Sequence, residues 1–147
     1  MAFSPDSKNI ITQGGAPDWN LEFWIWEKAR GALASISVVH SEDFHNKVVP
    51  TVQTVSFNPF DNTQICVTGQ HVLKLYRYSD GGLKQLSFAK MAETQKNFLC
   101  QSWIGEDRLV VGTDASRVCV FESGELVAEV CTPPLLLQSK CVFSFTK

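Results

Sequence analysis

Short apolar stretches alternate with turn-forming residues along most of the chain. Ile65–Thr68 and Val118–Phe121 are rich in β-branched and aromatic residues and are bounded by Gly, Asp and Ser. Such segments are typical of short strands packed on both faces of a sheet. Only the segment 87–99 has a pattern compatible with a helix, and Gln95–Asn97 interrupts its apolar side. The pattern therefore predicts an all-β chain, with a loop in the middle of that segment.

A single order of turns and strands occurs three times. Each unit starts with an aromatic residue before a Pro or Gly turn, and a short apolar strand that ends near Gly follows. An alternating strand then ends in an aromatic and a polar residue, and a last strand completes the unit. The units begin at Phe3, Phe57 and Trp103. Because one such unit cannot bury its apolar faces alone, stacked repeats are expected.

The length of the repeat indicates the architecture. We place the aromatic residue that ends the third strand at Trp26, Tyr76 and Phe121, which gives steps of 50 and 45 residues. A four-stranded propeller blade repeats every ~40 to 45 residues, and the polar insertion His40–Pro50 accounts for the longer step. The sequence therefore predicts a partial β-propeller of about three four-stranded antiparallel blades.

The periodicity divides the chain into five segments. The tail contains Pro133-Pro134, which a central strand cannot accommodate, and it lacks the turn signals of a blade. The predicted segments are an incomplete blade 1 at 1–38, an inter-blade loop at 39–51, blade 2 at 52–96, blade 3 at 97–130 and an atypical C-terminal tail at 131–147.

Composition and charge exclude several classes of partner. The 13 basic and 15 acidic residues give a net charge of −2 with no basic stripe, so we expect no nucleic acid partner. The longest apolar runs are far shorter than the ~20 residues that span a bilayer, so we expect no membrane partner. Five cysteines without a C-x-x-C spacing argue against a disulfide framework or zinc ribbon, and they favour a reducing compartment.

An ordered series of short motifs spans about residues 1–125. These motifs are Met1–Lys8, Trp26–Lys28, Asp61–Gln64, Cys66–Gly69, Leu83–Gln85, Val110–Asp114 and Phe121–Gly124. In this order they resemble the WD-repeat cilia- and flagella-associated protein 57 family. The Trp-Asp signature of WD repeats is degraded here to Trp26-Glu27, Tyr76-Arg77 and Phe121-Glu122.

The resemblance implies a place in the cell and a set of partners. Members of the family have tandem N-terminal propellers and a long coiled coil, and they are associated with inner dynein arms on axonemal doublet microtubules. We therefore expect a non-catalytic interaction scaffold of the ciliary or flagellar axoneme, within the cytoplasm and cytoskeleton, that supports inner dynein arm assembly or attachment and ciliary motility. Its expected partners are inner dynein arm components and doublet microtubule-associated proteins.

The absence of heptads and the atypical tail lead us to interpret the chain as a fragment of such a protein, from a truncated isoform or a partial gene model. Three blades leave apolar flanks and strand edges uncovered at both ends. We therefore expect the isolated chain to be unstable or to aggregate unless complementary blades are supplied.

Few side chains suggest a binding or catalytic site. The cluster His40–His45 could suggest a metal or Ser-His-Asp site, but no helix aligns its ligands, and we predict no metal, cofactor, small-molecule substrate or catalytic residue. Cys66, Cys100 and Cys119 lie among apolar residues and are predicted to be buried. Trp19 lies in a Gly-Pro-Asp loop, where its burial is not assured, and it is the candidate partner contact.

Two other functions remain open from the residues. The first is a WD-repeat adaptor in a non-ciliary complex, such as a ubiquitin ligase or a trafficking scaffold. The second is a small β-fold hydrolase that uses the His40–His45 loop, which the lack of a G-x-S-x-G nucleophile elbow disfavours.

Overall fold

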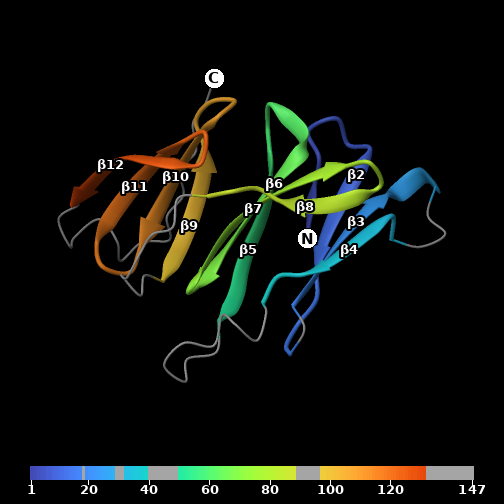
Figure 1. Cartoon of the computed structure of the whole chain (residues 1–147), viewed down its shortest axis with the longest axis horizontal. Helices are drawn as coiled ribbons and strands as arrows, with labels where there is room; N and C mark the ends of the chain where they lie inside the picture. Colours follow the sequence, from blue (N-terminus) through green and yellow to red (C-terminus); the bar gives the residue numbers. More distant parts are fainter. Residues whose placement is uncertain (18, 29–31, 40–49, 89–96, 132–147) are drawn as a thin grey trace.

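The computed structural model describes residues 1–17, 19–28, 32–39, 50–88 and 97–131. Within these residues the strands form three separate four-stranded antiparallel sheets, each paired in chain order (Figure 1). We call these sheets blades 1, 2 and 3. The predicted all-β class with three four-stranded antiparallel blades is confirmed. Of the predicted segments, residues 40–49 of the inter-blade loop, 89–96 and 132–147 of the tail lie outside the described residues.

The strands are short and end at tight turns. Blade 1 contains β1 (Ala2–Phe3), β2 (Asn9–Gln13), β3 (Asn20–Ile25) and β4 (Ala34–Ser37), with a 3-10 turn η1 (Trp26–Lys28) after β3. Blade 2 contains β5 (Thr51–Asn58), β6 (Asp61–Gln70), β7 (Val72–Ser79) and β8 (Gly82–Gln85). Blade 3 contains β9 (Phe98–Trp103), β10 (Arg108–Thr113), β11 (Arg117–Glu122) and β12 (Glu125–Cys131).

Two hairpins show why the turn residues are where they are. Asp80-Gly81 joins β7 to β8 and Ser123-Gly124 joins β11 to β12, and all four residues have positive φ. Positive φ at both central residues is the conformation of a type I′ turn, whose twist matches that of the strands it joins. Glycine adopts that conformation without steric cost, so these dipeptides set the register of the outer hairpins.

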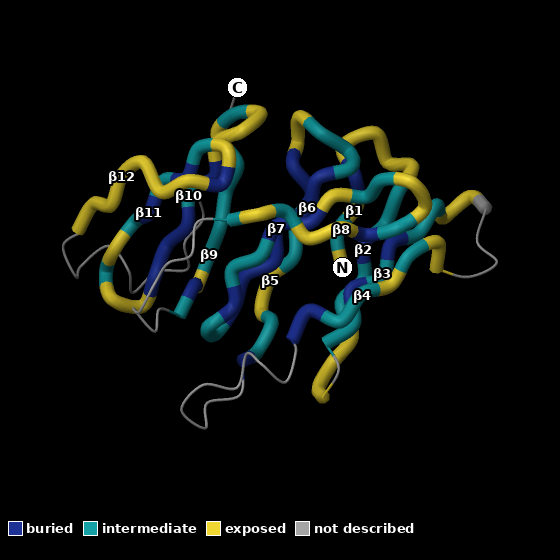
Figure 2. The backbone as a smooth tube through the Cα atoms, in the orientation of Figure 1, coloured by how far each residue is buried: buried dark blue, intermediate teal, exposed yellow. Residues whose placement is uncertain are grey.

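The core lies between the blades. One buried cluster joins blades 1 and 2 through residues such as Phe23, Ile65 and Tyr76, and a second joins blades 2 and 3 through residues such as Leu75 and Phe121. In β6, alternate side chains belong to different clusters, so the strand is buried on both sides and carries an unbroken buried run from Gln64 to Gly69 (Figure 2). The stacking of blades therefore supplies the burial that a single sheet lacks.

Strand register defines two faces of every blade. The face of each blade that carries the first aromatic residue of the unit is called the leading face. The opposite face is called the trailing face. Neighbouring residues on a strand point to opposite faces, so each face carries its own row of paired residues. The leading rows are Phe3, Ile10 and Trp24; Phe57, Ile65 and Tyr76; and Trp103, Leu109 and Phe121. The trailing rows are Ala2, Ile11 and Phe23; Ser56, Cys66 and Leu75; and Ser102, Val110 and Val120.

This register corrects one detail of the repeat. The counterpart of Tyr76 and Phe121 in blade 1 is Trp24, because β3 ends at Ile25 and Trp26 lies in η1. Trp26 is 48% exposed, and its Nε1 donates to the Ser7 carbonyl oxygen at 2.6 Å. The placement of Trp26 at the end of the strand was wrong, since two aromatic residues two positions apart fit the same alternating pattern.

Candidate interaction surface

Trp19 is held by its backbone in the loop between β2 and β3. Its N–H donates to the Gly15 carbonyl at 3.0 Å, and its carbonyl accepts from the Val38 N–H at 3.2 Å, just beyond β4. The residue has a φ of 45°, in the left-handed region. Its ring packs against the cluster between blades 1 and 2 and is half-buried. Trp19 is therefore anchored on one side and not a freely projecting loop residue.

A cleft of about 390 Å³ lies beside Trp19. Its other wall is the start of β5, where Val52 and Val55 contribute apolar surface. The remaining lining residues are Met1, Gln13, Gly14, Gly15, Gln53 and Thr54. The indole N–H of Trp19 is enclosed and has no hydrogen-bond partner among the described residues. An aromatic wall beside a strand of mixed apolar and polar residues is suited to receiving one side chain of a partner protein.

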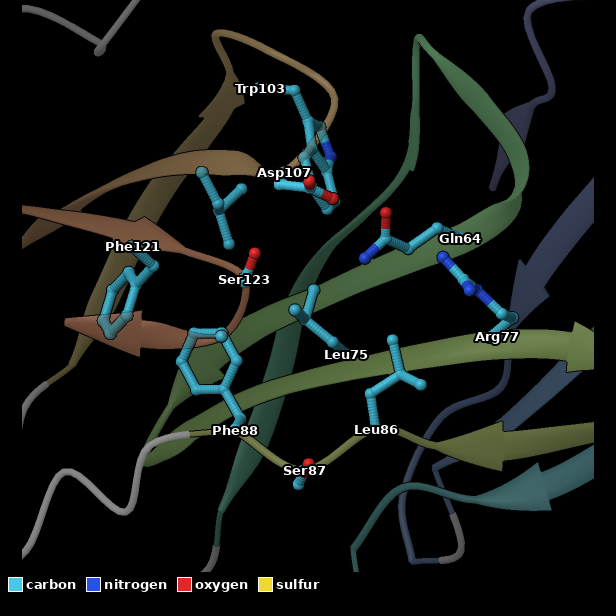
Figure 3. A pocket seen from close by; sticks show the side chains of 12 residues that line it. Gln64, Leu75, Arg77, Leu86, Ser87, Phe88, Trp103, Asp107, Phe121 and Ser123 are labelled. Atoms are coloured by element: carbon cyan, nitrogen blue, oxygen red, sulfur yellow. The ribbon is translucent and has the colours of Figure 1, made fainter. Parts of the chain in front are cut away.

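A second cleft, which the sequence did not indicate, opens between blades 2 and 3. It measures about 220 Å³ and brings together Leu75 of blade 2 and Phe88, which follows β8, with Trp103 and Phe121 of blade 3 (Figure 3). Gln64, Arg77 and Asp107 add polar groups to its rim. These residues come from separate repeats, so no local pattern in the chain could have placed them together.

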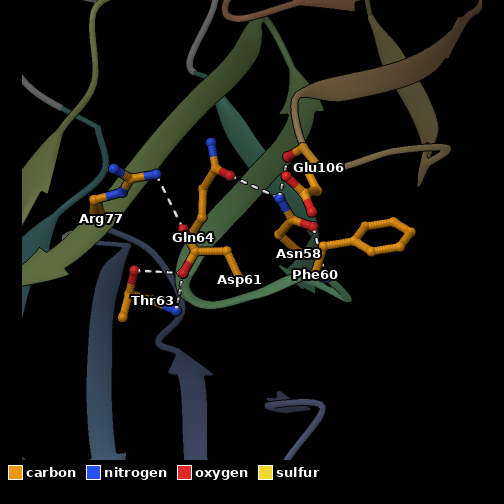
Figure 4. A network of polar contacts seen from close by, with 7 residues as sticks. All are labelled: Asn58, Phe60, Asp61, Thr63, Gln64, Arg77 and Glu106. Atoms are coloured by element: carbon orange, nitrogen blue, oxygen red, sulfur yellow. Dashed lines mark hydrogen bonds and ion pairs between the residues drawn. The ribbon is translucent and has the colours of Figure 1, made fainter.

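Polar side chains at the β5–β6 turn tie blade 2 to blade 3. The fully buried Asn58 donates through Nδ2 to Gln64 Oε1 and to the Glu106 carbonyl, both at 2.7 Å (Figure 4). Asn58 Oδ1 in turn accepts from the Phe60 N–H at 2.9 Å. The Glu106 carbonyl belongs to the β9–β10 turn of blade 3, so this amide is one of the contacts that join the two blades.

Asp61 organises the same turn through charge. Its carboxylate accepts from the Thr63 N–H and hydroxyl at 2.9 and 2.6 Å and pairs with Arg77 at 3.0 Å. Partial burial acts to raise the pKa of Asp61, but the hydrogen bonds from Thr63 and the charge of Arg77 outweigh it. The pKa therefore lies below the ordinary value of 3.8. The carboxylate stays ionised and keeps Arg77 beside the cleft.

We predict that Asn58→Ala lowers the free energy of unfolding by about 2 kcal/mol, because the buried Gln64 acceptor and the partly buried Glu106 carbonyl then lose their donor. Chemical denaturation at one fixed protein concentration measures the change. Lys84→Ala is the control, since it removes only the exposed Lys84–Asp80 pair and should change stability by less than about 0.5 kcal/mol. Equal effects of the two substitutions would contradict the role given to Asn58.

The described residues contain no cluster of potential metal ligands. Across these ranges no group of three or more His, Cys, Asp and Glu side chains could hold a metal ion. The His40–His45 cluster lies outside the described residues. Cys66 and Cys119 are buried and Cys100 is half-buried. Burial raises the pKa of the Cys66 thiol well above its usual value, which suppresses its reactivity. In the described segments no helix has the length and apolar character needed to cross a membrane.

Comparison with known proteins gives relatives of much greater length. No family model matches the chain. It is 40% identical over 125 residues to Cilia- and flagella-associated protein 57 of Mus musculus, which covers 85% of this chain and 9% of that protein. It is 22% identical over 131 residues to WD repeat-containing protein 90 of Mus musculus, which covers 84% of this chain and 6% of that protein. The chain thus spans less than a tenth of the length of either relative.

The same fold occurs in a solved structure. The β-propeller domain of Cps50 (Swd1) from Myceliophteria thermophila superposes with a TM-score of 0.65 over 90% of this chain and 41% of that one, at 11% sequence identity. This likeness shows the fold, and it identifies the three stacked sheets as propeller blades. The chain is thus a partial WD-repeat β-propeller and, over 125 of its residues, a relative of the cilia- and flagella-associated protein 57 family.

Proposed function

We propose that this chain acts as a non-catalytic WD-repeat scaffold in cilia or flagella. The observation that carries the proposal is its 40% identity, over 85% of its length, to a protein named for its association with these organelles. The structure is compatible with a binding role, because its stacked blades form clefts at which a partner can be held.

At a finer level, we propose that the scaffold is located on the axoneme. Its partners would be inner dynein arm components and doublet microtubule-associated proteins, and its role would be to support inner dynein arm assembly or attachment and ciliary motility. The family resemblance motivates this level of detail.

Trp19 and the cleft beside it form the proposed contact site. The ring packs against the core cluster between blades 1 and 2, and the backbone of Trp19 is hydrogen-bonded to Gly15 and Val38, so the residue has few other conformations open to it. A partner side chain that enters the cleft would bury Trp19 further without ordering a loose loop, so little conformational entropy opposes binding.

We expect Trp19→Ala to weaken binding to inner dynein arms or doublet microtubules by at least about tenfold, as the loss of a buried aromatic anchor does. Purified chain is titrated against inner dynein arms extracted from axonemes and, separately, against salt-washed doublets. The control is Trp26→Ala, which removes an exposed tryptophan at the opposite end of β3 from Trp19. If Trp19→Ala binds as tightly as the unmodified chain, Trp19 is not the partner contact.

Localisation separates the proposed role from its rival. A tagged chain expressed in ciliated cells should concentrate along the axoneme. Enrichment at cytoplasmic ubiquitin ligases or trafficking complexes, with none in the cilium, would favour the alternative of a WD-repeat adaptor in a non-ciliary complex.

A further inference from the structure

Neighbouring blades pack face to face, and we call each packed contact a joint. In the first joint, between blades 1 and 2, Phe23 stacks on Tyr78 with ring centroids 4.1 Å apart and planes 7° apart. Phe23 is 1% exposed, so its ring lies inside the joint. An aromatic pair therefore fills this part of the first joint.

The second joint, between blades 2 and 3, lacks this aromatic pair. Leu75 of blade 2 has the register position that Phe23 has in blade 1. Ser123 of blade 3 has the position of Tyr78 of blade 2, because each lies two residues after the last aromatic residue of its leading row. β7 continues through this position, whereas β11 ends before it. Leu75 and Ser123 both line the cleft of about 220 Å³, which therefore takes the place of the two rings.

The cleft has apolar walls and a size that suits one side chain. Leu75, Leu109 and Phe121 are at most 4% exposed, and the half-buried Trp103 lies beside them (Figure 3). Phe88 packs on Phe121 with ring centroids 4.6 Å apart. Small-molecule sites measure ~300–1,000 Å³, and this cleft is smaller. It is therefore better suited to one large apolar side chain of a partner than to a cofactor.

Contacts between turns hold the two blades together around the cleft. The β11–β12 turn lies against the segment after β8, since a methyl group on Gly124 would be 3.0 Å from the Ser87 carbonyl oxygen. Asn58 Nδ2 donates to the Glu106 carbonyl in the β9–β10 turn at 2.7 Å. The cleft is thus present before a partner binds, so its walls need not be ordered by the partner.

The rim of the cleft carries uncompensated negative charge. Arg77 is paired with Asp61 at 3.0 Å, so these two charges offset each other. Asp107 lines the cleft and Glu106 precedes it, and both are exposed. Within the described residues, no ion pair or hydrogen bond engages either of these two carboxylates. The rim is therefore complementary to positive charge.

We infer that the cleft between blades 2 and 3 binds a partner segment in which an aromatic residue is flanked by lysine or arginine. The aromatic ring enters the cleft and contacts Leu75 and Trp103, and the flanking cations face Asp107 and Glu106. A buried ring supplies most of the affinity, and the charges at the rim select the partner. The inference rests on the binding role proposed above, but it concerns a different site from Trp19 and does not depend on location in cilia.

Nuclear magnetic resonance of the isotope-labelled full chain tests the site directly. The chain has four tryptophans, and Trp103→Phe identifies the indole N–H signal that comes from the cleft wall. The probe is the capped tripeptide Lys-Phe-Lys. The capped peptide Lys-Ala-Lys keeps the charges without the ring, and Glu-Phe-Glu keeps the ring with opposite charges. We expect Lys-Phe-Lys to shift the Trp103 signal to saturation, Lys-Ala-Lys to bind at least about tenfold more weakly, and Glu-Phe-Glu also to bind more weakly.

Filling the cleft from within the chain should block the site. Leu75→Phe gives blade 2 the residue that blade 1 has at this position, and we expect Lys-Phe-Lys to bind it at least about tenfold more weakly. Leu99→Phe is the control, since Leu99 is 42% exposed in β9 and does not line the cleft, so binding should be unchanged. The backbone amide spectrum shows whether each variant is folded. Leu86→Phe, at a half-buried position of the same cleft, replaces Leu75→Phe if that variant is unfolded.

Neutralising the rim tests the charge of the partner. We expect Asp107→Asn to weaken binding of Lys-Phe-Lys about two- to fivefold, the effect of one exposed ion pair. Glu27→Gln is the matched control, because it removes an exposed carboxylate in η1 of blade 1, which does not line the cleft. Equal binding by these two variants would contradict the preference for a basic segment.

Three other results would overturn the inference. The first is a Trp103 signal that Lys-Phe-Lys leaves unchanged, and the second is equal binding of all three peptides. The third is a folded Leu75→Phe chain that binds Lys-Phe-Lys as tightly as the unmodified chain does. These results leave the proposed ciliary role untouched, because the Trp19→Ala titration uses axonemal partners and a separate cleft.

Discussion

Replacing Phe23 with Ala is expected to lower the free energy of unfolding by about 3–5 kcal/mol, the range for removal of a buried aromatic side chain. Phe23 is 1% exposed and lies at the centre of the joint between blades 1 and 2. Its ring stacks on Tyr78, with centroids 4.1 Å apart and planes 7° apart, and meets Phe57 edge-on. The substitution therefore removes two ring contacts and leaves a cavity between blades 1 and 2.

Urea denaturation followed by circular dichroism at one fixed protein concentration measures this loss. The matched control is Phe60→Ala, because Phe60 is 55% exposed and its removal should cost less than about 0.5 kcal/mol. If Phe23→Ala lowers the free energy of unfolding by less than about 1 kcal/mol, blades 1 and 2 do not meet in a packed core.

Replacing Gly69 with Ala is the second substitution with a large expected effect. A methyl group on Gly69 would overlap the Thr51 carbonyl oxygen and lie 2.9 Å from the Gln53 nitrogen, both backbone atoms of β5. The register of β5 and β6 shifts at this point, between Val52 and Thr54, so β5 crosses directly over the glycine. We expect a loss of about 3 kcal/mol, at the upper end for overpacking, because backbone cannot move aside as a side chain can.

The same substitution links stability to the proposed contact site. Val52, Gln53 and Thr54 form the wall of the cleft beside Trp19, so a displacement of β5 would also change that cleft. Gly82→Ala is the control, since a methyl group on Gly82 meets only the Ser79 carbonyl oxygen, at 3.9 Å, and Gly82 does not line this cleft. Denaturation and the binding titration should both change for Gly69→Ala and neither for Gly82→Ala. A fully stable Gly69→Ala protein would contradict the close approach of β5.

Local signals in the chain were sufficient to predict the sheets. Alternation of apolar and polar residues has the period of a strand, and Gly, Pro and Asp mark the turns that end it, so both signals lie within a few residues of each other. The Asp80-Gly81 and Ser123-Gly124 turns are examples in which the residue type selects the backbone conformation. The burial of Cys66 and Cys119 followed from the same local pattern.

Contacts between residues of different repeats could be identified only in the tertiary structure. Trp24 and Trp26 have equivalent patterns, and only pairing of Ile10 with Trp24 shows which of them occupies the leading face. The bond from Asn58 to the Glu106 carbonyl joins residues 48 positions apart, and the cleft between blades 2 and 3 joins residues of two repeats. Residues so far apart leave no periodic signal.

By itself, the sequence determined that this protein is built of three four-stranded units and that it resembles a ciliary WD-repeat family. Only the tertiary structure decided which face of each unit is leading and where the clefts open. The physical reason is that strand formation depends on neighbours along the chain. The contact between two blades depends instead on how two sheets pack face to face and on the register of their strands.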